Sequence, residues 1–425
     1  MATILLGGYY GAGNVGDEAI LAAILADFRA LAADLTFTVL SWDPDHTRRV
    51  HEVEAVDWRD IGGMVDAAQA SDLILVGGGG LFQDHWGLDP GSYLRLDHGG
   101  ITSYGSLPLL AAWVGVPCMI YGVGIGPLKG NLAREHTRLA AERCQMVCVR
   151  DELSSKALEE TGFKGINPNG TGVKITADPA FSLSTSAADE ETADGILEQH
   201  GLSGNVPLLA VNVRYWDQPH PPHEWLPGIA EGLGRFMEDH PALQVVLIPF
   251  QDHRESAYTD DKAPCQRLSR SLPEPERVHV LEAVPSPGLC QALLGRCDLV
   301  LGMRLHSLIL GINQRVPVVG LPYDPKVSAL MDEVGLAAYC LPTYNPDPGG
   351  LQDILEKAWQ DREQIRDQLS EISDEMARRA RENATRALEL LSAPFQPRRP
   401  GWMRWLGRRW MKLRYQVDRL LKGER

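Results

Sequence analysis

A buried strand, a polar turn, a helix and a second strand follow one another between Cys297 and Gly320, and this unit constrains the fold more than any other stretch of the 425 residues. The apolar run Cys297–Leu301 leads into GMRLHSLILGINQR, which has a helical pattern, and then into the apolar run Val316–Gly320. Parallel strands need such a helical crossover, so the pattern predicts an α/β domain. The turn between strand and helix is where α/β proteins bind anions, and we therefore expect an anion site there.

Two side chains at the start of this helix have the chemistry that an anion site needs. Arg304 carries a planar fork of hydrogen-bond donors that matches a carboxylate or a phosphate, and His306 can carry a proton near neutral pH. The structural alternative is that Arg304 pairs with a neighbouring aspartate, as arginines often do. An anion clamp beside a proton carrier predicts chemistry on a phosphorylated or carboxylated small molecule.

Further polar residues follow other strands of the same series. Arg214 and Gln251 each come just after an apolar run of the second half of the chain. Because the carboxyl ends of parallel strands meet at one edge of a sheet, we expect Arg214, Arg304 and His306 to converge on one rim of the second domain. The remaining predicted substrate-binding residues of this rim are Asp324 and Lys326.

Apolar runs and helical patterns alternate through most of the chain, which predicts α/β domains with doubly wound sheets. The apolar runs are continuous, as expected for parallel strands that are buried on both faces. Residues 184–206 are polar and acidic and form the expected boundary between a first domain, 1–183, and a second domain, 207–350. Residues 351–395 are predicted to form closing helices. We therefore expect two Rossmann-like domains facing a cleft, with the substrates bound between them.

A glycine-rich turn, Gly11–Gly16, follows the first strand and precedes the first helix with the spacing of a dinucleotide fingerprint. Asp43, after the second strand, is placed where a ribose-binding acid would lie. Asn14 and Asp17, however, crowd the helix start with polar and acidic groups that would oppose a pyrophosphate but suit a sugar hydroxyl. We predict that Asn14 and Asp17 bind substrate, with helix capping as the structural alternative.

A second glycine-rich loop, Gly77–Asp84, follows a later strand of the first domain. Four consecutive glycines at the carboxyl end of a strand imply that something approaches the backbone closely, so Gly79 and Gly80 are predicted to bind substrate. Asp84 is predicted to accept a proton or a hydrogen bond from a sugar hydroxyl, and the alternative is a cap on the next helix. After another strand, Asp151 is a predicted helix cap, and Arg150 is either an anion ligand or a surface charge.

The charge of the chain is unevenly distributed. The net charge is −15, but ten basic and only two acidic residues lie from Arg398 to Arg425. The acidic body argues against general affinity for nucleic acid. Within the tail, apolar residues recur at steps of three and four among the cations, which predicts a basic amphipathic helix over 398–425. Such a helix suits an anionic membrane surface, and the alternative is packing against this protein or a dimer mate.

The cysteines and the N-terminus indicate the cellular compartment in which the protein is expected. Seven cysteines without paired CxxC spacing predict reduced thiols, and no set of metal ligands is found, so no metal is expected. The N-terminus has no basic region and enters a strand at once, which is not typical of a signal peptide. No apolar run approaches the roughly 18 residues of a membrane span. We expect a cytoplasmic protein, held at the inner membrane face if the tail binds there.

Taken together, the motifs resemble the polysaccharide pyruvyl transferase family, in particular its CsaB-like branch. The resemblance covers about residues 1–390, and the tail departs from the usual family pattern. The motifs that carry it are, in order, GYYGAGNVGDEAIL (8–21), LVGGGGLFQD (75–84), YGVGIGP (121–127), VRDELS (149–154), ADPAF (177–181), NVR (212–214), GMRLHSL (302–308) and VGLPYDPKV (319–327).

This resemblance implies a GT-B-like fold and the transfer of pyruvate from phosphoenolpyruvate to a sugar. The product would be a ketal that bridges two hydroxyls, with N-acetylmannosamine a frequent acceptor in this branch. The family roles fall on Arg304 and His306 and extend to Asp84 and Arg214. In this scheme the two arginines hold phosphoenolpyruvate, His306 protonates its methylene carbon, and Asp84 accepts a hydroxyl proton. The scheme requires no cofactor.

Three other functions are compatible with parts of the sequence. A GT-B glycosyltransferase would bind a nucleotide sugar in the second domain, and a dinucleotide oxidoreductase would use the Gly11–Gly16 turn. A non-catalytic, membrane-associated sugar-binding protein would bind the acceptor but release no phosphate from phosphoenolpyruvate. If the acceptor is linked to a lipid, a membrane-bound tail would bring the enzyme to it.

Overall fold

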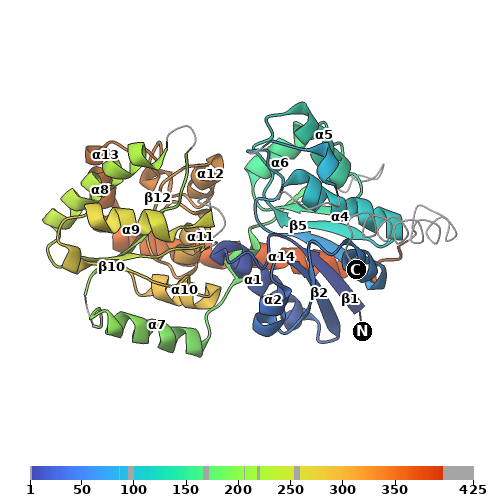
Figure 1. The fold of residues 1–425 in the computed structure, drawn as a ribbon, viewed down its shortest axis with the longest axis horizontal. Coiled ribbons are helices and arrows are strands. Elements are labelled where there is room, and N and C mark those ends of the chain that lie inside the picture. The colour runs from blue at the N-terminus through green and yellow to red at the C-terminus, as the bar shows by residue number, and fades with distance from the viewer. Residues whose placement is uncertain are drawn as a thin grey trace, which may run out of the picture. The chain divides into compact units, whose positions relative to one another are not determined.

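The computed structural model describes residues 2–85, 87–93, 100–165, 172–204, 206–217, 221–252 and 259–395 (Figure 1). The chain forms two compact units. The first contains the described residues of Met1–Ala12, Ile24–Pro179 and Arg379–Arg425, and the second contains Gly13–Ala23 and Ala180–Arg378. The division revises the expected first domain, 1–183, because the peptide Gly13–Ala23 belongs to the second unit and the end of the last helix belongs to the first.

The first unit is built on a seven-stranded sheet in the order β3-β2-β1-β4-β5-β6-β7, and all of its paired strands are parallel. Leu6 of β1 pairs with Val39 of β2 on one side and with Leu75 of β4 on the other, so the strand order reverses at β1. The strands are β1 Ala2–Gly7, β2 Leu35–Ser41, β3 Glu54–Asp57, β4 Leu73–Gly77, β5 Cys118–Val123, β6 Met146–Val149 and β7 Lys174–Ile175.

Helices surround this sheet, and their apolar sides form its core. Trp58 is fully buried, donates from its indole nitrogen to the carbonyl of Gly8 at 3.0 Å, and meets the ring of Tyr104 edge-on at 5.8 Å between centroids. The helices that begin in or belong to this unit are α2 Pro44–His51, α3 Ile61–Ala70, α4 Ile101–Val114, α5 Asn131–Ala141 and α6 Glu152–Glu159. Two longer helices, α1 Val15–Leu31 and α14 Arg362–Ser392, each contribute to both units.

The second unit has a five-stranded parallel sheet in the order β10-β9-β8-β11-β12. Its order reverses at β8, which pairs with both β9 and β11. The strands are β8 Leu208–Asn212, β9 Gln244–Leu247, β10 Val278–Val280, β11 Leu299–Gly302 and β12 Val318–Gly320. The helices are α7 Ala187–Gln199, α8 Pro222–Asp239, α9 Lys262–Ser271, α10 Pro287–Gly295, α11 Leu305–Asn313, α12 Pro325–Glu333 and α13 Pro348–Gln360.

Residues 184–206 are not the polar boundary that their composition suggests. They contain α7, which begins with a capping box between Ser186 and Asp189 and packs against α10. Arg296 binds Glu190 at 2.5 Å and Asp194 at 2.7 Å on this surface. The apolar stripe of α7 is narrow, which explains why the helix was not recognised among so many acidic residues. The closing helices expected over 351–395 are α13 and α14.

Two further expectations concern membranes and metals. Over the ranges that the structure describes, no helix is both long and apolar enough to cross a bilayer. Within the same ranges, no group of three or more histidine, cysteine, aspartate or glutamate side chains is arranged to hold a metal ion. The predicted amphipathic tail, 398–425, lies outside the described residues.

Candidate active site

The candidate site of the second unit begins where β8 and β11 end, at the point where the strand order reverses. Asn212, the last residue of β8, joins three strand ends with its side chain and backbone. Its Oδ1 accepts from the N–H of Arg304 at 3.0 Å, its Nδ2 donates to the carbonyl of Ile248 at 3.0 Å, and its carbonyl accepts from the N–H of Met303 at 3.0 Å. The turn before α11 is therefore rigidly held at the position where open α/β sheets bind ligands.

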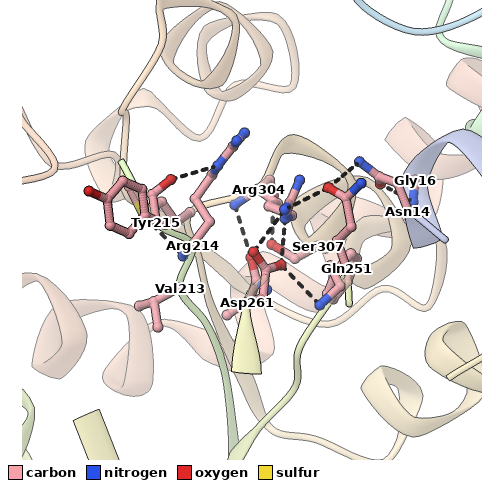
Figure 2. A network of polar contacts seen from close by, with 12 residues as sticks. Asn14, Gly16, Val213, Arg214, Tyr215, Gln251, Asp261, Arg304 and Ser307 are labelled. Atoms are coloured by element: carbon pink, nitrogen blue, oxygen red, sulfur yellow. Dashed lines mark hydrogen bonds and ion pairs between the residues drawn. The ribbon is translucent and has the colours of Figure 1, made fainter. Parts of the chain in front are cut away.

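Arg304 lies at this turn, but its guanidinium is already engaged. Nε donates to Oδ2 of Asp261 at 2.6 Å, Nη2 donates to Oδ1 of the same carboxylate at 2.7 Å, and Nη2 also donates to Oε1 of Gln251 at 3.1 Å (Figure 2). Arg304 is only 6% exposed and Asp261 is completely buried. Burial disfavours the charged guanidinium, but the adjacent Asp261 carboxylate keeps the pKa of Arg304 above its ordinary value.

These contacts correct the expectation that Arg304 presents its whole fork to an anionic substrate. The bidentate face of the guanidinium is used by Asp261, which is the structural role that arginines often have. Arg304 therefore acts first as a fixed internal cation that orders the turn before α11. Among the described residues, none accepts a hydrogen bond from its third nitrogen, Nη1.

The polar network continues from Arg304 into the glycine-rich motif at the start of the chain. Gln251 accepts from Nδ2 of Asn14 at 3.4 Å, and Asn14 in turn accepts from the N–H of Gly16 at 2.9 Å (Figure 2). The N–H of Val15 donates to the carbonyl of Phe250 at 2.9 Å. The start of α1 thus belongs to the site of the second unit. Asp17, half-buried in the first turn of α1, adds a negative charge that favours the charged form of Arg304.

His306 lies in the first turn of α11, directly against Gly16. A Cβ atom added to Gly16 would lie 2.1 Å from Nδ1 of His306 and 2.4 Å from its Cγ. Only glycine leaves room for the imidazole at this place. The structure therefore brings together His306, Arg304, Gln251, Asn14 and Gly16, which come from motifs almost 300 residues apart in the sequence.

A second group of cationic side chains lies in the same unit, around Tyr323. Nη1 of Arg214 donates to the Tyr323 hydroxyl at 3.1 Å, and Nζ of Lys326 lies 5.0 Å from the centre of its ring. Asp324 caps α12 by accepting from the N–H of Lys326 at 3.0 Å, and its carboxylate is 3.8 Å from the ammonium group. Two cations beside one half-buried phenol form a surface suited to a small anion.

Asp84 and the glycines before it lie in the first unit. Gly78 and Gly79 have φ of 65° and 76°, so they permit the turn after β4, while Gly80 is exposed. Asp84 does not cap the helix that follows it. Its two oxygens accept from the N–H groups of Lys129 and Gly130 at 2.9 and 2.7 Å, just before α5. Each carboxylate oxygen retains acceptor capacity beyond these bonds.

Arg150 is a buried structural residue, whereas the sequence leaves open whether it is an anion ligand or a surface charge. It is buried and donates to Asp151 at 3.1 Å and to Asp178 at 3.0 Å. A Cβ atom added to Gly124 would lie 2.6 Å from the Cζ of Arg150. Burial opposes the charge of Arg150, but its two aspartates keep its pKa above the ordinary value. Asp151 also caps α6, as predicted, by accepting from the N–H of Ser154.

Asp43 does not have the ribose-binding role that a dinucleotide site would require of it. Asp43 accepts from the N–H of His46 at 2.9 Å and caps α2. Gly11 and Gly13 have φ of 75° and 64°, and a Cβ atom on Gly11 would lie 2.1 Å from Oγ of Ser41. The glycines of this turn are therefore explained by backbone conformation and close packing.

Sequence reasoning did not find three residues of the site. Asp261 follows Asp260 just before α9, and no motif around it points to Arg304. Asn212 and Tyr323 stand inside quoted motifs, but nothing in their spacing indicates a contact with a residue about 90 or more positions away. These pairings depend on which strand ends are neighbours in the sheet.

The two parallel sheets, each reversing its order at the first strand, define a chain of two Rossmann-like domains with a GT-B-like fold. A putative UDP-N-acetylglucosamine 2-epimerase from Listeria monocytogenes has a similar structure, with a TM-score of 0.59 at 14% identity over 91% of this chain and 95% of that one. A glycosyltransferase from Rickettsia africae also has a TM-score of 0.59, at 10% identity over 92% of this chain and 99% of that one. At these identities the likeness concerns the fold alone, and the prediction of two Rossmann-like domains with a GT-B-like fold is confirmed.

The sequence comparison identifies the family. The model of the polysaccharide pyruvyl transferase family matches residues 14–325, and the chain belongs to this family. A curated relative, the amylovoran biosynthesis protein AmsJ of Erwinia amylovora, is 22% identical over 324 residues, which cover 74% of this chain and 70% of the relative. The predicted family membership is confirmed, and the protein is a transferase that acts in polysaccharide biosynthesis.

Proposed function

We propose that this protein transfers pyruvate from phosphoenolpyruvate to a sugar of a cell-surface polysaccharide or of its lipid-linked precursor, forming a ketal and releasing phosphate. The observation that carries the proposal is the position of His306. It lies in the first turn of α11 against Gly16, two residues after the buried Arg304, and in the same unit as the Arg214–Lys326 cation pair. An enzyme that transfers the pyruvyl group of an enol phosphate needs a proton donor for the methylene carbon and a surface that binds the anionic groups.

The roles of the cations differ from those first expected. Arg214 and Lys326 bind the phosphate or carboxylate of phosphoenolpyruvate, because they are half-buried and converge on Tyr323. Arg304 orders the turn before α11 through its ion pair with Asp261. Gln251 and Asn14 hold the start of α1 to this turn.

In the proposed reaction, His306 donates one proton and Asp84 accepts another. His306 in its protonated form gives a proton to the methylene carbon, and the adjacent carbon becomes electrophilic. One sugar hydroxyl attacks that carbon and gives its proton to Asp84, whose carboxylate is held by two N–H groups. Phosphate leaves, and the second hydroxyl closes the ring. The remaining residues of the proposed acceptor and donor surfaces are Asp17, Gly79, Gly80 and Asp324.

The test is to incubate the protein with phosphoenolpyruvate and a panel of sugar acceptors that includes N-acetylmannosamine derivatives, and to measure released phosphate and ketal. His306→Ala should abolish most of the ketal formation, whereas His223→Ala, on an exposed side chain of α8, should not change it. Undiminished ketal formation by His306→Ala would remove His306 from the mechanism. Saturable binding of uridine or guanosine diphosphate without phosphate release would favour a nucleotide-sugar glycosyltransferase, and acceptor binding without either would favour a sugar-binding protein.

The tail supports a second part of the proposal, which is that residues 398–425 bring the enzyme to an anionic membrane. Its surplus of cations and its apolar stripe are the properties of a helix at a bilayer surface. Deletion of 398–425 should release the protein from phosphatidylglycerol vesicles in a sedimentation assay and should not alter its behaviour with phosphatidylcholine vesicles. Equal binding of the full-length and truncated proteins to the anionic vesicles would reject this part.

A further inference from the structure

The phenol of Tyr323 lies between two cations. The Cζ of Arg214 is 4.9 Å and the Nζ of Lys326 is 5.0 Å from the centre of its ring, and the ring of Trp216 packs edge-on against it at 4.9 Å. The hydroxyl itself is 3.1 Å from Nη1 of Arg214. The edge-on contact, the two cations and the hydrogen bond together hold the ring of Tyr323 in place.

The hydrogen bond from Arg214 determines where the proton of Tyr323 can go. A guanidinium only donates, so the phenol oxygen is the acceptor in this contact. The O–H of Tyr323 remains available for donation, because no hydrogen bond from it to a described residue is found. An anionic oxygen bound between Arg214 and Lys326 would supply an acceptor for it.

The charges around Tyr323 also make its proton easier to release. Burial raises the pKa of this phenol, but the positive charges of Lys326 and Arg214 outweigh the effect of burial, and the pKa lies below its ordinary value. Asp324 acts in the opposite direction, and the phenol of Tyr323 also interacts with the charge of Arg304. A phenolate formed here would be stabilised by the two neighbouring cations.

We infer that Tyr323 is a catalytic residue that donates its proton to the departing phosphate, an inference that rests on the proposed function. When the C–O bond between the pyruvyl carbon and the phosphate breaks, its electron pair goes to the phosphate oxygen, and that oxygen takes the proton of Tyr323. Tyr323 then regains a proton from the second sugar hydroxyl as the ketal closes. The protons balance, because the first hydroxyl proton ends on Asp84, the proton of Tyr323 leaves on the phosphate, and the second hydroxyl proton restores Tyr323. Asp84 then loses its proton to solvent and His306 takes one up from solvent, which returns both residues to their starting forms.

The test compares Tyr323→Phe with the wild-type protein, with phosphoenolpyruvate and the best acceptor of the panel as probes. Loss of a general acid should lower kcat for phosphate release by about 100-fold or more, while KM for phosphoenolpyruvate rises by no more than about tenfold. Tyr339→Phe is the matched control, because its hydroxyl donates to Asp361 in the same unit and should not affect turnover. A Tyr323→Phe variant that keeps kcat within about threefold would overturn the inference.

A pH profile separates this role from a structural one. A proton donor is active while protonated, so activity should fall as pH rises through the pKa of Tyr323 in the complex. Incorporation of 3-fluorotyrosine at position 323 keeps the hydroxyl and nearly the same volume but makes it more acidic, so the alkaline limb of kcat should move to lower pH. An unmoved limb would contradict the inference even if Tyr323→Phe failed to fold. If the wild-type protein itself releases no phosphate, the proposed function fails, and this is distinguishable from failure of the role of Tyr323.

Discussion

Replacement of Gly16 by alanine is the sharpest perturbation that the structure offers, because it changes one methyl group next to His306. The added Cβ would lie 2.1 Å from Nδ1, whereas ordinary contacts begin at about 3.4 Å, so the imidazole must move by about 1.3 Å. Gly16 does not have a positive φ, so alanine fits the backbone of α1. The substitution therefore tests the contact with His306 and little else.

The size of the effect follows from this displacement. A misplacement of about 1 Å at a reacting group costs about 100-fold in rate, or about 2.7 kcal/mol of transition-state stabilisation. Alanine in a helix gains about 0.5–1 kcal/mol over glycine, and overpacking costs about 1–3 kcal/mol, so the free energy of unfolding should change by no more than about 2.5 kcal/mol. We expect a folded protein with kcat for ketal formation about 100-fold lower.

The assay is phosphate release from phosphoenolpyruvate in the presence of an acceptor, with urea unfolding as the measure of stability. Gly195→Ala in α7 is the control, because an added Cβ there meets no described atom within 4 Å. In a double-mutant cycle, Gly16→Ala should have no further effect once His306 is alanine. A Gly16→Ala enzyme with nearly wild-type kcat, or an equal loss in both backgrounds, would refute the reasoning.

The other predictions concern buried charges and thiols. Asp261→Asn leaves Arg304 without its carboxylate, and the free energy of unfolding in urea should fall by about 3–5 kcal/mol. Gly124→Ala presses on the buried Arg150 and should cost about 1–3 kcal/mol, measured in the same way. Burial raises the pKa of Cys148 to about 12 and also raises the pKa of the half-buried Cys340, so iodoacetamide at pH 8 should label Cys340 slowly and the fully buried thiols more slowly still in the native protein.

Each of these predictions has an outcome that would contradict it. An Asp261→Asn protein as stable as the wild type would show that the bidentate pair is not required. A stable Gly124→Ala protein would mean that the guanidinium can shift without loss of its aspartates. Rapid modification of the buried cysteines in the folded state, detected by mass spectrometry of tryptic peptides, would show that their surroundings open readily.

Much of the fold could be predicted because buried parallel strands are unbroken apolar runs. The apolar run MVCV coincides with β6, Met146–Val149, and the apolar run LLAV makes up most of β8, Leu208–Asn212. Short or polar elements were missed, such as β3, Glu54–Asp57, whose strand pattern is weak, and α7, whose acidic surface hides a narrow apolar stripe. A local pattern identifies a strand or helix whose residues are mostly apolar because they are buried. It does not identify an element that forms only because it packs against distant parts of the chain.

The site was predicted in part for the same reason. The placement of Arg304 and His306 at one helix start follows from a local pattern of strand, turn and helix. The partner of Arg304 could not be found in this way, because Asp261 is 43 residues away and reaches it only through the three-dimensional fold. The contact between Gly16 and His306 likewise depends on tertiary structure, although the glycine-rich spacing indicated that something approaches the backbone.

The assignment of Gly13–Ala23 to the second unit has a consequence for any attempt to divide this enzyme. A recombinant fragment cut as one continuous stretch, 180–378, would omit the peptide that carries Asn14 and Gly16. Such a fragment should be incomplete on its own, and a synthetic peptide of 13–23 supplied separately is the piece that would complement it. Exchange of halves between relatives would likewise have to carry this short segment along with the distant half to which it belongs.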